Sequence, residues 1–353
     1  MSPNNFHQDR GRFRRVASRV FVGATLCWLG SFAGLAAAGT NPVLVGVIFP
    51  SQNQARWAIE EKIFVARAQA NGDKVIFQYS DESAVTQKNQ VESMIQRGVK
   101  VLVLVTIDPV AAAGLVKEAQ AKGIKVIGYD RFVVGATPSY NIGRDYYETG
   151  KLQATTALQM FPSGQYALIR GDKATLAQIE MSRAYDDVVL NTTGINVVYD
   201  APTPNWETAS AQREVEAAIQ KHPNIKAVVT MWDDGGQAAV QALKSAGKKP
   251  GDVYVSGTNA STPSLRYIAQ GWQTQTVWAP IDKLALTAAD VAHALGTGTS
   301  PPAPNATVGG VPTYYAPQIN VTKANLCEFI KKIAPAGWVT AEEVFGADSK
   351  SCE

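Results

Sequence analysis

The sequence predicts an α/β fold made of two doubly wound parallel-sheet lobes. Short apolar runs alternate with segments of helical spacing from about residue 43 onward, which is typical of buried parallel strands and the helices that cover them. Gly98 and Gly123 each end a helical segment, and an apolar run begins within two residues, as in the short helix-to-strand connections of such sheets. The alternation forms two series along the chain, so we expect two similar lobes.

In the first series, Trp57, Ile63 and Phe64 recur at helical spacing after the first apolar run, so a strand leads into a helix. Asp108-Pro109 is suited to cap and open the third helix of the series. The expected order is strand 43–49, helix 56–70, strand 75–79, helix 87–97, strand 101–105, helix 108–122 and strand 124–128.

The second series has the same alternation. We expect strands at 166–170, 195–199, 227–231 and 253–256, with helices at 176–190, 207–221 and 235–246 between them. A segment rich in Gly, Pro and Thr, residues 296–310, is typical of an exposed loop. The short strand-like pieces 276–280 and 311–315 on either side of the segment 281–310 are interpreted as extra crossings between the lobes.

The first 38 residues have the layout of a signal peptide. A basic head with five Arg is followed by an uncharged apolar stretch and by Ala36-Ala37-Ala38, which resembles a cleavage site. A retained membrane anchor is the alternative, because the apolar stretch approaches spanning length. The chain of 353 residues has a formal net charge of +3. Residues 1–38 alone carry a net charge of +4, which leaves −1 for the rest of the chain. The remainder is therefore slightly acidic, which does not indicate nucleic acid as a partner.

Beyond the predicted signal peptide the chain has two cysteines, Cys327 and Cys352. In an exported protein such a pair can oxidise, so we predict a disulfide that closes the C-terminal tail. Two free thiols are the alternative.

Residues suited to catalysis are scarce. His7, His222 and His293 are the only histidines of the sequence, and neither a metal-ligand spacing nor a catalytic triad can be assembled from them. The sequence also lacks a glycine-rich phosphate loop. We therefore predict a protein that is not an enzyme and has no cofactor and no metal. A glycosidase is the enzymatic alternative.

The strand expected at 124–128 ends in an aromatic residue, a carboxylate and a guanidinium, Tyr129-Asp130-Arg131. Ligands of open parallel sheets bind beyond the carboxyl ends of the strands, and an Asp–Arg pair offers acceptors and donors to hydroxyl groups. A structural ion pair between Asp130 and Arg131 is the alternative. Other polar or aromatic residues near strand ends complete the candidate set: Arg56, Trp57, Trp206, Trp232, Asp233 and Asn259.

The chain resembles the periplasmic sugar-binding proteins of the ribose/xylose type over about residues 43–320, and it is most similar to those that bind D-xylose. The resemblance is carried by Val99-Lys100-Val101-Leu102-Val103, Gly123-Ile124-Lys125-Val126, Tyr129-Asp130-Arg131, Gly150-Lys151-Leu152-Gln153-Ala154 and Val240-Gln241-Ala242-Leu243. It implies a type I fold in which two lobes, joined by three crossings, close on a ligand. It also implies a monomeric periplasmic substrate-binding component of an ABC transporter, with a membrane permease as its partner.

On this resemblance we expect an N-terminal lobe of residues 43–142 plus 279–310. The C-terminal lobe then comprises 143–278 plus 311–333, and 334–353 form a C-terminal tail.

The resemblance assigns sugar contacts residue by residue. Arg56, Asp130 and Arg131 match the family's first-lobe ligands, and Trp206 matches its stacking residue in the second lobe. Other second-lobe positions depart from the family pattern: a family Asn is replaced by Trp232 before the retained Asp233, an Asp by Asn259 and a Lys by Ala279. An Asn expected near Ala177-Gln178 is missing as well. The expected ligand is therefore a xylose-like sugar or a related polyol.

The predicted function is the capture of a monosaccharide for delivery to a permease. A sensory protein of the same fold, which presents the ligand to a receptor kinase or a chemoreceptor, is the main alternative. A sugar-responsive DNA-binding repressor shares the lobe architecture, but the export signal stands where its helix-turn-helix would lie.

Overall fold

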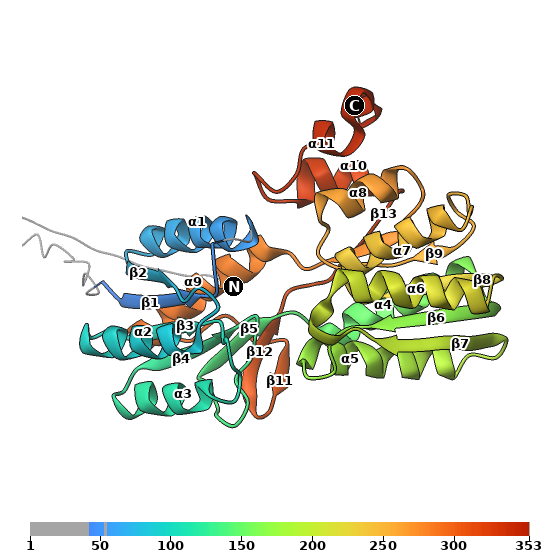
Figure 1. The fold of residues 1–353 in the computed structure, drawn as a ribbon. Helices are drawn as coiled ribbons and strands as arrows, with labels where there is room; N and C mark the ends of the chain where they lie inside the picture. The colour runs from blue at the N-terminus through green and yellow to red at the C-terminus, as the bar shows by residue number, and fades with distance from the viewer. Residues whose placement is uncertain (1–41, 53–54, 353) are drawn as a thin grey trace, which may run out of the picture. The chain divides into compact units, whose positions relative to one another are not determined.

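The computed structural model describes residues 42–52 and 55–352 (Figure 1). The predicted signal peptide, residues 1–38, lies outside this part of the chain. The described residues form α/β units with parallel sheets, which confirms the predicted fold class. None of the described helices combines the length and the apolar character needed to cross a membrane.

Among the described residues, one sheet has seven strands in the order β11-β12-β5-β4-β3-β1-β2. All neighbours are parallel except β11 and β12, which pair antiparallel. The strands are β1 (Leu44–Phe49), β2 (Lys74–Tyr79), β3 (Val101–Leu104), β4 (Lys125–Tyr129), β5 (Tyr140–Gly143), β11 (Ala306–Val308) and β12 (Val311–Tyr315).

Two hydrophobic clusters cover the two faces of this sheet. One cluster includes buried residues of α1 and α9, and the other includes buried residues of α2 and α3. Because both faces are covered, the central strands are continuous apolar runs rather than alternating ones. The helices are α1 (Ala55–Ala70), α2 (Ala84–Gln96), α3 (Ala112–Ala121) and α9 (Ile281–Thr297).

A second sheet has four parallel strands in the order β7-β6-β8-β9. Its hydrophobic core includes residues of the four helices that alternate with these strands along the chain. The strands are β6 (Gly164–Arg170), β7 (Ile195–Pro202), β8 (Ile225–Thr230) and β9 (Tyr254–Val255); the helices are α4 (Tyr146–Met160), α5 (Leu176–Tyr185), α6 (Thr208–Lys221) and α7 (Asp233–Ser245).

The sheet topology corrects the interpretation of residues 311–315 as a crossing between the lobes that leads into the C-terminal lobe. These residues are β12, which pairs in parallel with β5 of the first sheet. The segment 296–310, which was expected to be a loop, contains a strand, because residues 306–308 form β11. A hairpin turn at Gly309-Gly310 then leads into β12, which pairs with β11. Both glycines have positive φ, 56° and 80°, as a two-residue hairpin turn requires.

The other expected crossing piece, 276–280, corresponds to β10 (Gln275–Trp278). It pairs antiparallel with β13 (Ile319–Thr322) in a separate two-stranded sheet. β5 was not predicted, since Asn141 and Gly143 interrupt its four residues and leave no apolar run.

Two helices differ from their predicted bounds by about one turn or more at one end. The helix expected from residue 108 begins at Ala112, because the side chain of Asp108 accepts hydrogen bonds from the N–H groups of Val110 and Ala111 just before it. The helix expected over 176–190 changes at Asp186 from α5 to a π-helical turn.

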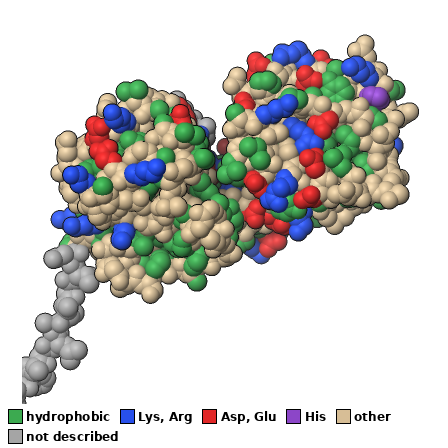
Figure 2. Space-filling view, turned by 90° about the horizontal axis from the view of Figure 1, so that it is seen from below, with side chains coloured by type: hydrophobic (Ala, Val, Ile, Leu, Met, Phe, Trp, Pro, Cys, Tyr) green, Lys and Arg blue, Asp and Glu red, His purple; other side chains and the backbone are tan. Residues whose placement is uncertain are grey.

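The C-terminal part packs around aromatic residues. Trp278 contacts the rings of Phe329 and Trp338, with centroids 5.6 Å and 4.6 Å away. Cys327 and Cys352 form a disulfide in the structure. This part contains α8 (Thr262–Ala269), α10 (Leu326–Glu328) and α11 (Ala341–Phe345). Figure 2 shows basic and acidic side chains interspersed over one face of the molecule.

Candidate functional site

A cavity of about 290 Å³ lies beyond the carboxyl ends of β4 and β5. This is the edge at which open parallel sheets bind ligands. Its lining comes from segments far apart in the sequence: Arg56, Trp57, Asp130, Arg131, Arg144, Tyr146, Asn259 and Trp338. Five of the eight predicted ligand-binding residues are among them.

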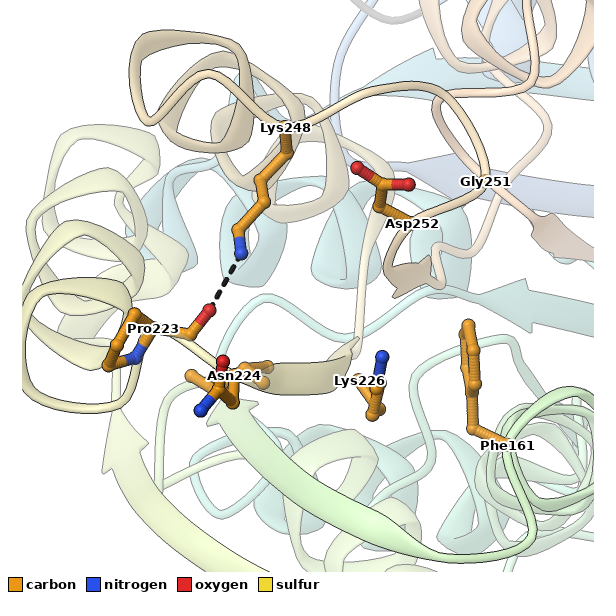
Figure 3. A pocket seen from close by; sticks show the side chains of 8 residues that line it. Phe161, Pro223, Asn224, Lys226, Lys248, Gly251 and Asp252 are labelled. Carbon is orange, nitrogen blue, oxygen red and sulfur yellow. Dashed lines mark hydrogen bonds between the residues drawn. The ribbon is translucent and has the colours of Figure 1, made fainter.

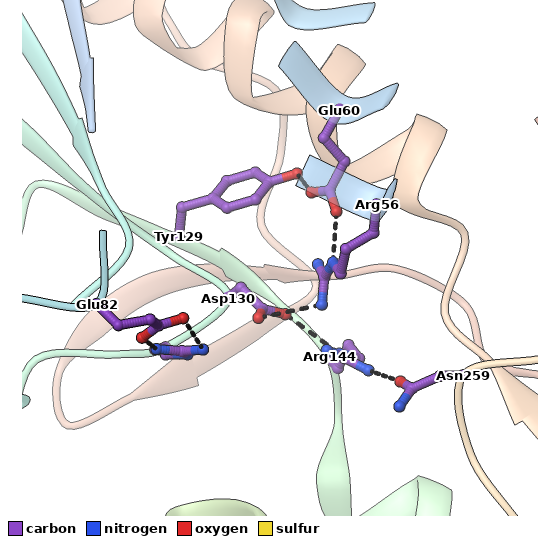
Figure 4. A network of polar contacts seen from close by, with 8 residues as sticks. Arg56, Glu60, Glu82, Tyr129, Asp130, Arg144 and Asn259 are labelled. Carbon is purple, nitrogen blue, oxygen red and sulfur yellow. Dashed lines mark hydrogen bonds and ion pairs between the residues drawn. The ribbon is translucent and has the colours of Figure 1, made fainter. Parts of the chain in front are cut away.

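Asp130 is the carboxylate at the centre of this cavity's polar network (Figure 4). Its φ of 57° lies in the left-handed region, which is strained for a non-glycine residue and is often found at ligand sites. Its N–H donates to the carbonyl of Ile142 (2.8 Å), which ties this conformation to β5. One carboxylate oxygen accepts from Nε of Arg144 (3.1 Å), and the other accepts from Nη1 of Arg56 (3.3 Å).

The charge of Asp130 is stabilised despite its burial. Burial opposes ionisation, but the guanidinium groups of Arg144 and Arg56 outweigh it and hold the pKa of Asp130 well below its usual range. Asp130 is therefore a permanently ionised acceptor at neutral pH.

Arg56, in the first turn of α1, is held by a second carboxylate. Its Nε donates to Glu60 (2.7 Å) one helical turn later, and Glu60 also accepts from the hydroxyl of Tyr129. Its guanidinium stacks on the indole of Trp57, 4.0 Å from the ring centroid, a favourable cation–π geometry. Burial alone would lower the pKa of Arg56, but Asp130 and Glu60 raise it. Arg56 is thus a rigid, charged donor at the cavity wall.

Arg131 does not form the ion pair with Asp130 that was weighed as an alternative. Its guanidinium donates instead to both carboxylate oxygens of Glu82, at 3.1 and 3.4 Å. Its side chain keeps 35% of its exposure and lines the cavity, so the pairing leaves it accessible.

Arg144 is a cavity residue that was not predicted. It follows β5 directly, donates to Asp130 through Nε, and donates through Nη1 to Oδ1 of Asn259 (2.6 Å). Its guanidinium also lies 5.8 Å from the ring centroid of Tyr146. A polar residue after a strand was the available signal, and it was missed because β5 itself was missed. Tyr146 and Trp338 are the other unpredicted lining residues.

Trp206 and Trp232 pack against each other rather than lining this cavity. Their rings meet edge to face, 5.4 Å between centroids. Gly171 and Gly235 provide the space for them, since a Cβ at either position would lie less than 3 Å from the neighbouring indole. In this structure the two tryptophans therefore form an aromatic pair of the second-sheet core.

Asp233, the first residue of α7, is also absent from the cavity lining. Its carboxylate accepts hydrogen bonds from the N–H of Ser261 (2.6 Å) and the hydroxyl of Thr276 (2.7 Å). Burial raises the pKa of Asp233 to about 6, although both of these hydrogen bonds act to lower it. In this structure Asp233 connects the start of α7 to Ser261 and to Thr276 of β10.

We expect Asp233→Asn to become more stable relative to the wild type as pH rises from 4 to 7. A carboxyl whose pKa is higher in the folded state binds its proton more tightly there, so ionisation above its unfolded value, 3.8, costs folding free energy until about pH 6. Over this pH range the free energy of unfolding of Asp233→Asn is expected to rise by about 2–3 kcal/mol relative to that of the wild type. Urea denaturation of both proteins across this range measures it, and a difference that does not change with pH would contradict the burial effect.

A second cavity, of about 360 Å³, lies at the amino ends of the strands of the second sheet (Figure 3). It is lined by residues at or near the amino ends of β6, β8 and β9, among them Phe161, Lys226 and Asp252. Lys248 donates there to the carbonyl of Pro223 (2.6 Å). Amino ends of parallel strands are not where such sheets bind ligands, so we regard the cavity beside Asp130 as the functional one. Among the described residues, no group of His, Cys, Asp and Glu is arranged to hold a metal ion.

Comparisons with known proteins place the chain in a family. Residues 45–300 match a family model described as a periplasmic binding protein domain. The chain is 34% identical over 307 residues to the D-xylose-binding periplasmic protein of Escherichia coli (strain K12), covering 84% of this chain and 92% of that protein. It is 26% identical over 331 residues to the multiple sugar-binding periplasmic receptor ChvE of Rhizobium radiobacter, covering 85% and 92%.

A solved structure shares the fold. An ABC transporter solute binding protein from Clostridium phytofermentans, with bound beta-D-glucose, superposes with a TM-score of 0.74. The match covers 85% of this chain and 99% of that one at 22% identity.

Proposed function

Because the chain belongs to the periplasmic binding protein family, we propose that it captures a monosaccharide or a related polyol and delivers it to the permease of an ABC transporter. Its relatives are sugar-binding proteins rather than enzymes, and the chain is likewise not an enzyme. The observation that carries the proposal is the carboxylate of Asp130, held between Arg56 and Arg144 in a cavity at the carboxyl ends of the strands.

The chemistry of the cavity suits a hydroxylated ring. A fixed carboxylate accepts hydrogen bonds from hydroxyl groups, and guanidinium N–H groups donate to their oxygens. Aromatic side chains beside these groups, Trp57, Tyr146 and Trp338, supply apolar surface for the faces of a sugar ring.

We further propose that closure of the two lobes completes the site. In the closed form Trp206 and Trp232 would cover the ring, and Asp233 would add a second-lobe contact. Closure of this kind needs contacts that form only in the closed state. The lobe limits proposed from the sequence change only in that 311–315 belong with the first sheet.

Isothermal calorimetry against pentoses, hexoses and polyols, D-xylose and myo-inositol among them, tests the proposal. We expect at least one of these compounds to bind with a stoichiometry of one. Circular dichroism of the same sample serves as the folding control. If the folded protein bound none of them, the sugar assignment would be wrong.

A sensory role is the second candidate, because a relative that covers 85% of this chain is described as a receptor. Co-purification of the sugar-loaded protein with a permease or with a receptor ectodomain distinguishes the two roles. We also propose that the protein is exported as a monomer after cleavage near Ala38, which the N-terminal sequence and the native mass of periplasmic material would test.

A further inference from the structure

The side chains that line the cavity carry more positive than negative charge. Three guanidinium groups, of Arg56, Arg131 and Arg144, face one carboxylate, that of Asp130. Glu60 and Glu82 contact two of these arginines but do not line the cavity. A ligand in the cavity therefore meets a predominantly cationic wall.

Two hydrogen-bond donors on lining residues are also unpaired among the described residues. Nη2 of Arg56 and Nε1 of Trp57 are buried and have no hydrogen-bond partner among the described residues. Part of the acceptor capacity is already in use, because each oxygen of Asp130 accepts one hydrogen bond from a guanidinium and Oδ1 of Asn259 accepts one from Arg144. A buried donor without a partner lowers the stability of the folded protein. A ligand with hydrogen-bond acceptors would satisfy these donors.

The second lobe supplies no compensating carboxylate to the cavity. Asp233 is 2% exposed, and its oxygens accept from Ser261 and Thr276. At the other candidate position the chain has Asn259, a neutral residue. Neutral sugars need acceptors for their hydroxyl hydrogens as well as donors, and the charged groups that line this cavity are three guanidinium groups and one carboxylate.

We infer that the ligand is a monosaccharide bearing a carboxylate, such as a uronate or an aldonate, and that Arg144 determines this specificity. The inference rests on the proposed function and narrows its substrate class. A guanidinium matches a carboxylate with two parallel hydrogen bonds. Arg144 is suited to this role because Asp130 and Asn259 fix its orientation from two sides.

Calorimetry with matched pairs tests the inference: D-galacturonate with D-galactose, D-glucuronate with D-glucose, and D-xylonate with D-xylose. D-glucose 6-phosphate serves as the phosphate arm. We expect at least one acid to bind 10-fold or more tightly than its neutral partner. In Arg144→Gln the ratio of acid affinity to neutral affinity is expected to fall at least 10-fold.

Arg183→Gln is the matched control, since it removes the same charge from a side chain that is 57% exposed and lies outside the cavity lining. We expect it to leave both affinities unchanged. Thermal unfolding of each variant identifies any loss of fold. If Arg144→Gln does not fold, Arg144→Lys replaces it, because lysine keeps the positive charge but cannot make two parallel hydrogen bonds to a carboxylate.

The possible outcomes separate the inference from the proposed function. Tighter binding of neutral sugars, or of the phosphate alone, would overturn the carboxylate inference and leave sugar binding in place. A preference for acids that survives in Arg144→Gln would overturn the role of Arg144. Binding of none of the compounds by folded protein would overturn both.

Discussion

Asp130→Asn is expected to destabilise the protein by about 3–5 kcal/mol, the usual cost of removing one partner from a buried ion pair. The side chains of Asp130, Arg56 and Arg144 keep only 3%, 12% and 12% of their exposure. The variant leaves two desolvated guanidinium groups without their shared carboxylate. Asn is close to Asp in shape and tolerates positive φ, so the loss reports the charge rather than the backbone. Urea denaturation at pH 7 measures it.

The matched control is Asp290→Asn, which breaks an Asp–Arg ion pair on the surface. Asp290 accepts from Nε and Nη2 of Arg67 at 2.6 and 3.0 Å, but the two side chains keep 31% and 44% of their exposure. An exposed pair contributes about 1 kcal/mol or less. Equal losses in the two variants would show that burial does not set the energy of the Asp130 network.

The difference between wild type and Asp130→Asn also depends on pH. Because the pKa of Asp130 is lowered in the folded protein, its stabilising contribution is complete above the unfolded value, about 4. It is lost as pH falls below that value. This dependence is opposite in sign to the one expected for Asp233, so the two carboxylates can be told apart in the same titration.

Gly150→Ala is expected to destabilise the protein by about 1–3 kcal/mol or more, through overpacking between two helices. Gly150 lies in α4, and a Cβ there would lie 2.7 Å from the carbonyl oxygen and 2.9 Å from the Cα of Met181 in α5. Backbone atoms of a packed helix cannot move aside as a flexible side chain can. The free energy of unfolding, again from urea denaturation, checks the value.

Gly114→Ala is the control for Gly150→Ala. Gly114 lies in α3, is exposed, and has no atom within 4 Å of the position of a new Cβ. Alanine there is expected to stabilise by about 0.5–1 kcal/mol, because glycine is the poorer helix former. If Gly150→Ala also proved stabilising, α4 and α5 would not be in the close contact described.

The parts of the site that could be predicted from sequence lie next to strongly patterned strands. Asp130 and Arg131 follow β4, a buried apolar run, and Arg56 was identified by its place near the end of the first strand as well as by family resemblance. Arg144 could not be predicted because β5 contains no apolar run that would mark it as a buried strand. Trp338 reaches the cavity from the C-terminal part, where no strand pattern indicates a nearby ligand site.

The partners of charged groups were not predictable from sequence position either. Adjacent residues Asp130 and Arg131 seemed an obvious pair, but successive side chains after a strand point in different directions, and Arg131 binds Glu82 instead. Asp233 also follows a strand, as expected, but the turn at Ser261 and the hydroxyl of Thr276 engage its carboxylate. Tertiary contacts decide whether such a carboxylate faces ligand or protein.

The β11–β12 hairpin has a consequence for the order in which the molecule can assemble. All four strands of the second sheet lie between residues 164 and 255, so this sheet can form while the rest of the chain is still being synthesised. The first sheet begins at Leu44 but lacks its edge until β12, ending at Tyr315, pairs with β5. Pairing between such distant segments is slow, so we expect completion of the first sheet to limit the rate of folding.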